Sequence, residues 1–220
     1  MTQLQSDLGG LRERVLAMAS YAAGAVRDAM KALAERDDEL AARVEDDDDI
    51  LDRLEKTVDE TAIHLLMRAP LGRDLRLIVV ATKIGHDLER VGDEATAIAR
   101  RARDLNREPP LKASFDLPRM ATMVLEMLTA AIDAFVSGNA DAARAVIPRD
   151  KDVDQLNKQI HHELTSLLAQ DPASIARCLC FMAISKRLER IGDHAKNIAE
   201  EAVYLAEARD IRHPTSLPAG

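Results

Sequence analysis

The sequence predicts an all-α protein made of two tandem up-down three-helix bundles that are related by internal duplication. Three observations support this prediction. Aromatic residues make up only 2% of the chain and tryptophan is absent, which favours helices packed through aliphatic side chains over strands. Apolar residues recur at three- and four-residue steps, the period of an amphipathic helix. The two halves also share residues at a fixed spacing, as duplicated units do.

The apolar period predicts three helices in the first half, over about 4–36, 40–69 and 73–106. Asp37 or Asp38 can supply the side-chain acceptor that begins the second of these helices. Three prolines within 107–118 cannot continue a helix and predict a linker.

The second half repeats this plan, with predicted helices over about 118–136, 140–169 and 173–209. Pro148 is expected to kink the middle helix or to mark its true start. We therefore divide the chain into a first bundle (1–108), a linker (109–117), a second bundle (118–210) and a disordered tail (211–220).

The duplication is visible in the residues themselves. A shift of 100 positions superposes nine residues on identical ones, namely Ile84, Leu88, Glu89, Arg90, Gly92, Asp93, Ala95, Ile98 and Ala99. A shift of 102 superposes Asp48 and Asp52 on Asp150 and Asp154. Two three-helix units that arose by duplication are the simplest explanation.

Net charge and motif content exclude several classes of function. A net charge of -8 disfavours nucleic-acid binding, which usually needs a dense basic face. We recognise no signal peptide and no apolar run that approaches the roughly 20 residues needed to span a bilayer, so we expect a cytoplasmic protein without membrane insertion. The common catalytic motifs are missing, so we expect no enzyme activity and assign no catalytic residues.

Pairs of acidic residues four positions apart are the candidate functional feature. Each pair projects from one face of its helix, where like charges repel unless a cation compensates them. In an up-down bundle, the second and third helices of each unit run antiparallel and can bring two pairs together. The predicted metal ligands are Asp48, Asp52, Glu89 and Asp93 in the first unit, and Asp150, Asp154, Glu189 and Asp193 in the second.

The residue types narrow the metals that these sites could hold. Clustered carboxylate oxygens suit magnesium, calcium, manganese or iron better than soft metals. His86 or His194 nearby would also allow zinc or nickel. Gly92 and Gly192 stand inside helices, where glycine costs roughly 1 kcal/mol relative to alanine, so we expect a neighbouring helix or a bound cluster to approach closely there.

A simpler interpretation stays open, because acidic residues on helices are usually solvated and can pair with nearby bases such as Lys186 or His86. Arg90 and Arg190 are interpreted first as partners of these carboxylates, and alternatively as contacts for an anion or a partner protein.

The stretches 87–99 (DLERVGDEATAIA) and 187–200 (RLERIGDHAKNIAE), with GRDL at 72–75, resemble the PhoU family of accessory proteins of bacterial phosphate-specific transport. The resemblance covers almost the whole chain and implies paired three-helix bundles, homodimers, and multinuclear metal clusters, iron in some members, held by E/DxxxD motifs. Glu94, Thr96 and Ala97 replace the His-x-x-Asn seen at His194 and Asn197. The first site is therefore expected to differ in metal number or affinity, with His194 and Asn197 as auxiliary residues of the second.

The resemblance also implies a function in phosphate homeostasis. It implies a negative regulator that couples the nucleotide-binding subunit of the phosphate ABC transporter to a membrane sensor histidine kinase. Two alternatives stay open from the residues. One is a metal-free helical scaffold that binds basic partners through its acidic faces. The other is a ferritin-like carboxylate metalloenzyme, disfavoured because the Glu-x-x-His pair of those enzymes is missing.

Overall fold

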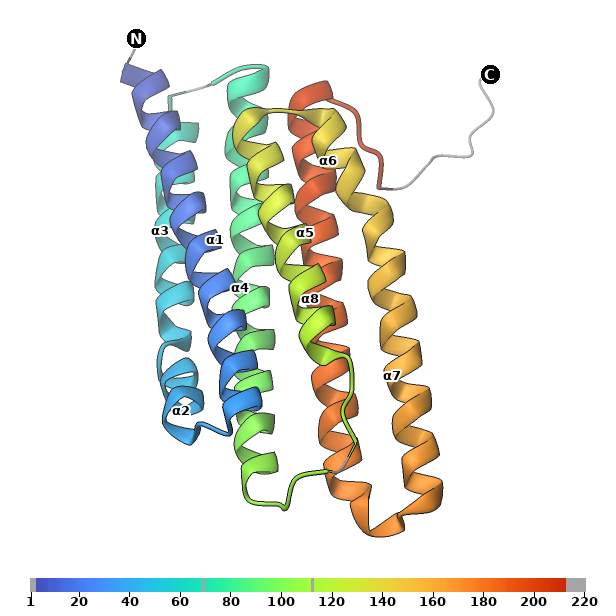
Figure 1. Cartoon of the computed structure of the whole chain (residues 1–220). Helices are drawn as coiled ribbons and strands as arrows, with labels where there is room; N and C mark the ends of the chain where they lie inside the picture. Colours follow the sequence, from blue (N-terminus) through green and yellow to red (C-terminus); the bar gives the residue numbers. More distant parts are fainter. Residues whose placement is uncertain (1–2, 69, 112, 213–220) are drawn as a thin grey trace.

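The protein is a flat array of long helices packed side by side (Figure 1). This computed structural model describes residues 3–68, 70–111 and 113–212. Within these residues the first half forms α1 (Gln3–Glu35), α2 (Asp38–Asp46), α3 (Asp48–Leu66) and α4 (Arg73–Asn106). The second half forms α5 (Leu117–Ser137), α6 (Ala140–Val146), a 3-10 turn (Ile147–Arg149), α7 (Asp150–Gln170), a second 3-10 turn (Pro172–Ser174) and α8 (Ile175–Glu207).

The ends of the helices follow from local side-chain chemistry. Asp37 accepts a hydrogen bond from the backbone N–H of Leu40 and so caps α2, as one of the two predicted capping residues. Asn139 caps α6 in the same way. Gly138 ends α5 with a positive φ of 66°, a conformation that glycine adopts without steric cost.

The prediction of one continuous second helix is wrong, because the helix is interrupted at Asp47. Asp47 lies in the middle of five consecutive acidic residues, 45–49, where like charges repel and aspartate favours helix ends over interiors. The new helix α3 therefore starts with Asp48 and Asp49 in its first turn, where negative charge is favourable. The predicted interruption at Pro148 is confirmed, as a 3-10 turn between α6 and α7.

The two halves share one hydrophobic core. Buried aliphatic residues from all eight helices described above form one continuous cluster, and α4 and α8 pack against each other in the middle of the array (Figure 1). Ile84 and Leu88 of α4 and their counterparts Ile184 and Leu188 of α8 are fully buried. The residues that the duplication conserves therefore belong largely to this central packing.

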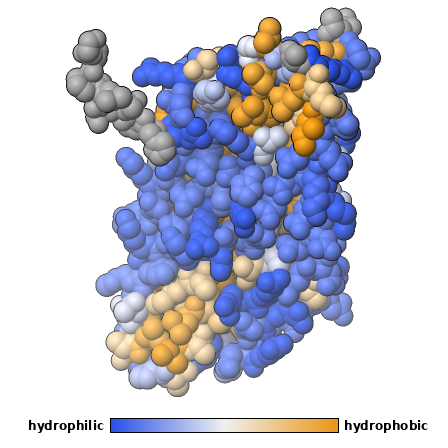
Figure 2. All heavy atoms as spheres, turned by 180° about the vertical axis from the view of Figure 1, so that it is seen from behind, coloured by the Kyte–Doolittle hydropathy of each residue, from blue (hydrophilic) through white to orange (hydrophobic). Residues whose placement is uncertain are grey.

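The most exposed aliphatic side chains lie in two places. One lies where α3 meets α4, with Ile63, Met67 and Leu71 exposed, and the other at the start of α8, with Ile175 and Leu179 exposed. Figure 2 shows the two areas as orange surface at opposite ends of the molecule.

Helix α5 and the C-terminal tail bear on two expectations from the sequence. Helix α5 is long and apolar enough, by length and composition, to cross a membrane, with a mean hydropathy of 1.5 over 18 residues. Half of that window is buried inside the bundle, as in the core helix of a globular protein. At the start of the predicted tail, Ile211 packs on the core and Arg212 pairs with Glu201; residues 213–220 lie outside the described residues.

Candidate functional site

The first carboxylate cluster lies between α3 and α4. Asp48 and Asp52 come from α3, and Glu89 and Asp93 from α4. Burial raises the pKa of Glu89, and the negative charges of Asp93, Glu55 and Asp52 raise it further against the opposing effect of Arg90. Three of the four predicted ligands, Asp52, Glu89 and Asp93, therefore share one electrostatic neighbourhood.

Asp93 is the second member of this cluster whose titration is perturbed. Burial raises its pKa, Arg90 opposes this, and Asp48 and Asp52 raise it again. Arg90 provides the local compensation, because its Nη1 donates to Asp93 Oδ2 at 2.9 Å and its Nε lies 3.4 Å from Glu89 Oε2. Glu89 Oε2 is buried and accepts no hydrogen bond. A buried carboxylate oxygen that accepts no hydrogen bond is costly, and a bound cation would compensate it more closely than the 3.4 Å contact with Arg90 does.

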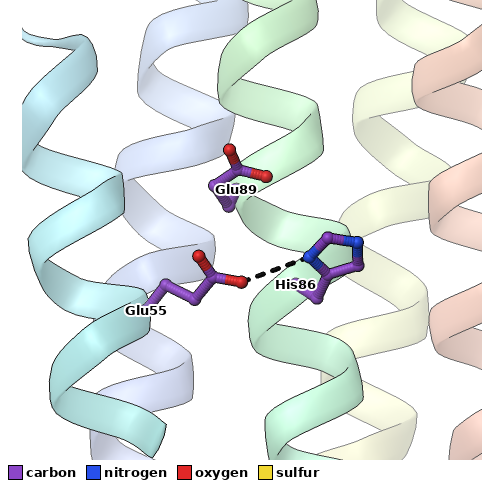
Figure 3. Close-up of side chains that lie close together, drawn as sticks. All are labelled: Glu55, His86 and Glu89. Carbon is purple, nitrogen blue, oxygen red and sulfur yellow. Dashed lines mark hydrogen bonds and ion pairs between the residues drawn. The ribbon is translucent and has the colours of Figure 1, made fainter.

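One ligand-competent residue of this region, Glu55, was not predicted. Glu55 of α3 lies beside His86 and Glu89 of α4, and the three side chains offer ligand atoms within 4.8 Å of one another (Figure 3). His86 Nδ1 is 3.2 Å from Glu55 Oε1. The sequence contained a signal for Glu55. It lies three residues after Asp52 and seven after Asp48, and so shares their helix face.

The second cluster repeats the arrangement between α7 and α8. Asp150 and Asp154 come from α7, and Glu189 and Asp193 from α8. Burial raises the pKa of Asp193, and Asp150, Glu189 and Asp154 raise it further, while Lys196 lowers it. Asp150 Oδ1 and Glu189 Oε2 are buried without a hydrogen-bond partner. The second half thus also holds buried carboxylate oxygens that accept no hydrogen bond, one of which, Glu189 Oε2, is ion-paired with Lys186.

Comparison with known proteins identifies the duplicated unit. The model of the PhoU domain matches the chain twice, over residues 15–102 and 117–202. The chain belongs to the PhoU family. Each PhoU domain contains one complete carboxylate cluster.

The similarity extends over nearly the whole chain. The phosphate-specific transport system accessory protein PhoU homologue of Pseudomonas aeruginosa is 38% identical, over 96% of this chain and 88% of that protein. The homologue of the same name from Clostridium acetobutylicum is 35% identical, over 94% of this chain and 95% of that protein.

Two solved structures show the same fold. The crystal structure of PhoU from Pseudomonas aeruginosa matches with a TM-score of 0.90 and 38% identity, covering 94% of this chain and 100% of that chain. The phosphate transport system regulatory protein PhoU from Streptococcus pneumoniae matches with a TM-score of 0.89 and 27% identity, covering 95% and 99%. The tandem helical architecture predicted from the sequence is therefore confirmed.

The two PhoU domains differ in what faces the first aspartate of each cluster. Thr96 Oγ1 donates to Asp48 Oδ1 at 2.9 Å. Its counterpart Lys196 places Nζ 2.8 Å from Asp150 Oδ2. A neutral hydroxyl in the first domain thus stands where the second domain has a cation.

A further cation faces the second cluster, where Lys186 pairs with Glu189. In the first domain His86 occupies the position that corresponds to Lys186 and contacts Glu55. The first cluster therefore has more uncompensated negative charge than the second, and also an imidazole nitrogen.

The predicted auxiliary residues of the second site lie elsewhere. His194 Nδ1 is 2.8 Å from Asp87 Oδ1, and Asn197 Nδ2 donates to the same oxygen at 3.3 Å. Both residues therefore contact α4 of the other domain rather than the second cluster. Arg190 also differs from its counterpart, because it pairs with Glu94 while Arg90 pairs with the cluster acids of its own helix.

The two helix glycines have unequal surroundings. A Cβ on Gly92 would lie 2.2 Å from Leu51 Cδ1, whereas a Cβ on Gly192 would meet Val153 Cγ1 at 3.4 Å and Val124 Cγ1 at 3.5 Å. The expected close approach of a neighbouring helix is found at Gly92, where it lets α3 bring its aspartates toward α4.

Proposed function

We propose that this protein is a metal-binding regulatory adaptor of phosphate uptake. It acts as a negative regulator of phosphate-starvation signalling and couples the nucleotide-binding subunit of the phosphate ABC transporter to its membrane sensor histidine kinase. Membership of the PhoU family supports this proposal, together with relatives that are named as accessory proteins of the phosphate-specific transport system. A cytoplasmic location and a homodimer are part of the proposal.

The observation that supports the metal-binding part is the set of buried carboxylate oxygens that accept no hydrogen bond, Glu89 Oε2, Asp150 Oδ1 and Glu189 Oε2. Arg90 and Lys186 partly compensate the charge of the first and the third. Each belongs to a residue that the E/DxxxD pairs had singled out. Hard cations take oxygen ligands of this kind, so iron, manganese, magnesium and calcium fit both clusters. The nitrogen of His86 makes zinc or nickel an additional option in the first domain only.

A bound cation would supply positive charge that holds α3 against α4, and α7 against α8. The protein's own residues do the rest. Glu89 and Asp93 present their carboxylates from one face of α4. Arg90 pairs with both and limits their repulsion when no cation is present. Metal occupancy would thereby set the stability of each helix pair, and with it the surface offered to partners.

Metal content tests the first part of the proposal. The protein is purified without chelator and without a metal-capturing tag, and its metals are measured by elemental analysis. We expect at least one equivalent of metal per chain, and a loss of metal and of thermal stabilisation in the double variant Glu89→Gln/Glu189→Gln. Glu126→Gln, an exposed acidic residue outside both clusters, is the matched control. Metal-free wild-type protein that gains no stability from any of these cations would refute metal binding.

Pull-down tests the second part. The full chain is offered to the purified transporter ATPase and to the sensor kinase, with metal and after its removal. The proposal expects capture of both partners and a change in capture when metal is removed. Capture that is sensitive to salt but indifferent to metal would favour the metal-free scaffold instead, and that alternative has support in Lys186 and Lys196, which already compensate the second cluster.

A further inference from the structure

A polar cavity of about 440 Å³ lies where the end of α4 meets α8. We call it the arginine cavity. Five arginines, two acids and one alanine line it: Arg100, Arg101, Arg103, Arg107, Arg187, Glu45, Asp104 and Ala97. None of these residues belongs to the carboxylate clusters. The cavity is therefore separate from the proposed metal sites.

Most of its guanidinium groups are held in place by acids. Glu45 of α2 accepts from Arg103 Nη1 at 2.9 Å and from Arg100 Nε at 3.3 Å. Glu94, which is buried, accepts from Arg187 Nη1 at 2.9 Å. A guanidinium has five N–H donors, so each of these contacts fixes its position while leaving donors for a ligand.

Cationic charge at the cavity exceeds anionic charge, in a protein whose net charge is -8. Five arginines face two acidic residues in the lining. The guanidinium of Arg107 is exposed, and within the described part of the chain it has neither an ion pair nor a hydrogen bond. Arg101 pairs with Asp104, so the cationic excess rests mainly on Arg107, and an added anion would compensate it.

The helix dipole explains only part of this arrangement. Arginines at the C-terminal end of α4 interact favourably with the negative end of the helix dipole. This explains the presence of Arg103 and Arg107 as individual residues. It does not account for Arg187, which enters the same cavity from the middle of α8. Convergence of guanidinium groups from two helices is typical of recognition of an oxyanion.

We propose that the arginine cavity binds a small anion carrying two or three linked phosphate groups, either inorganic or the phosphate chain of a nucleotide. Guanidinium groups bind phosphate oxygens in bidentate geometry, and the cavity volume lies within the roughly 300–1,000 Å³ of small-molecule sites. The lining contains no aromatic residue. It offers nothing on which a base could stack, so the phosphate chain is the recognised part.

Calorimetric titration of the full chain tests this site. The protein is stripped of metal and then dialysed free of chelator, because chelators are themselves polyanions and metal at the carboxylate clusters would bind phosphate independently. Pyrophosphate and ATP are titrated into wild type, into Arg100→Gln/Arg107→Gln, and into the control Arg27→Gln/Arg119→Gln. The control removes the same charge outside the cavity. Circular dichroism establishes that each variant is folded.

We expect saturable binding of one pyrophosphate per chain, with ATP within about threefold of the same affinity. A charged hydrogen bond contributes roughly 1.5–3 kcal/mol, and 1.4 kcal/mol corresponds to tenfold, so the cavity variant should bind at least about 100-fold more weakly. The control should change by less than about threefold. No saturable binding, or an equal loss in the control, would overturn the proposal. Because the test uses metal-free protein, its failure is independent of the metal proposal.

Discussion

Asp87 of α4 lies 2.8 Å from His194 of α8, measured from Oδ1 to Nδ1, and this contact joins the two domains. A shift of 100 positions turns residues 87 and 194 into residues 187 and 94. There Arg187 Nη1 donates to Glu94 Oε2 at 2.9 Å. Equivalent positions of the two domains therefore pair twice across the α4–α8 interface. In one pair the acid is Asp87 at the first position, and in the other it is Glu94 at the second position.

The buried member of this arrangement gives the first prediction. Glu94 is only 6% exposed and pairs with both Arg187 and Arg190. Replacing it by glutamine leaves two arginines without their counter-charge, but both are partly solvated. We therefore expect a loss of roughly 1–3 kcal/mol in the free energy of unfolding, below the 3–5 kcal/mol of a fully buried pair.

Urea denaturation measures this loss. Glu126→Gln is the matched control, because Glu126 pairs with Arg149 on the surface and exposed pairs contribute about 1 kcal/mol or less. Equal losses in the two variants would show that the interface pair is no more important than a surface pair.

Local pattern was sufficient to predict the long helices and the grouping of the carboxylates. Apolar periodicity and proline positions located the helices, and antiparallel packing of adjacent helices was enough to bring Asp48 and Asp52 toward Glu89 and Asp93. These features depend on neighbours in the chain, or on neighbours within one hairpin of the bundle.

Contacts between the domains could not be predicted in the same way. The roles of Asp87, Glu94 and His194 depend on how α4 docks on α8, about 100 positions away in the sequence, and the spacing of residues within one helix does not contain that information. His194 was consequently predicted to assist the second cluster. The interruption at Asp47 was missed because it arises from charge repulsion and not from proline or glycine.

The helix glycines give the second prediction. Alanine is favoured over glycine inside a helix by about 1 kcal/mol, but at Gly92 its Cβ would overlap Leu51, which is 5% exposed. Overpacking typically costs about 1–3 kcal/mol, so Gly92→Ala should be destabilised by roughly 1 kcal/mol. At Gly192 the contacts are ordinary, and Gly192→Ala should be unchanged or more stable by up to about 1 kcal/mol. Thermal and urea unfolding of the two variants measure the contrast, and equal effects would contradict it.

The third prediction concerns pH and metal-free protein. Burial, with the neighbouring acids, raises the pKa of Glu89, Asp93 and Asp193 in the folded state. A carboxyl group with a raised folded pKa binds protons more tightly when folded, so its charge opposes folding at neutral pH and this opposition is relieved as pH falls. These groups should therefore raise stability as pH is lowered from 7 toward the ordinary pKa values of 4.5 for glutamate and 3.8 for aspartate.

Denaturation midpoints of wild type and of Glu89→Gln/Asp93→Asn/Asp193→Asn, measured from pH 7 to pH 4.5, separate this effect from the rest of the chain. The variant should be more stable than wild type at pH 7, and the difference should shrink as pH falls. A difference that stays constant with pH would contradict the raised pKa values. Glu207 acts in the opposite direction, because its hydrogen bond to Arg144 lowers its pKa, but it is the same in both proteins and cancels in the comparison.

The fourth prediction concerns the inequality of the two proposed metal sites, and follows from Thr96 and Lys196. Lys196 Nζ lies 2.8 Å from an oxygen of Asp150, so a cation entering the second cluster must displace or tolerate an ammonium group. Thr96 donates to Asp48 without adding charge, so the first cluster faces one cation, Arg90, where the second faces two, Lys186 and Lys196. Coulomb repulsion between nearby cations amounts to several kcal/mol even at an effective dielectric constant of about 20, so the first cluster should bind divalent metal at least about tenfold more tightly than the second.

Reciprocal exchange of the two residues provides the measurement. Metal titration is followed in Lys196→Thr, in Thr96→Lys and in the double exchange. Lys196→Thr should strengthen the weaker site by about tenfold or more, Thr96→Lys should weaken the stronger site by a similar factor, and the double exchange should reverse the order of the two sites. Site assignment comes from repeating each titration with Glu89→Gln or Glu189→Gln. If the two sites keep their order after the double exchange, the difference between them arises from Glu55 and His86, which contribute ligand atoms in the first domain only.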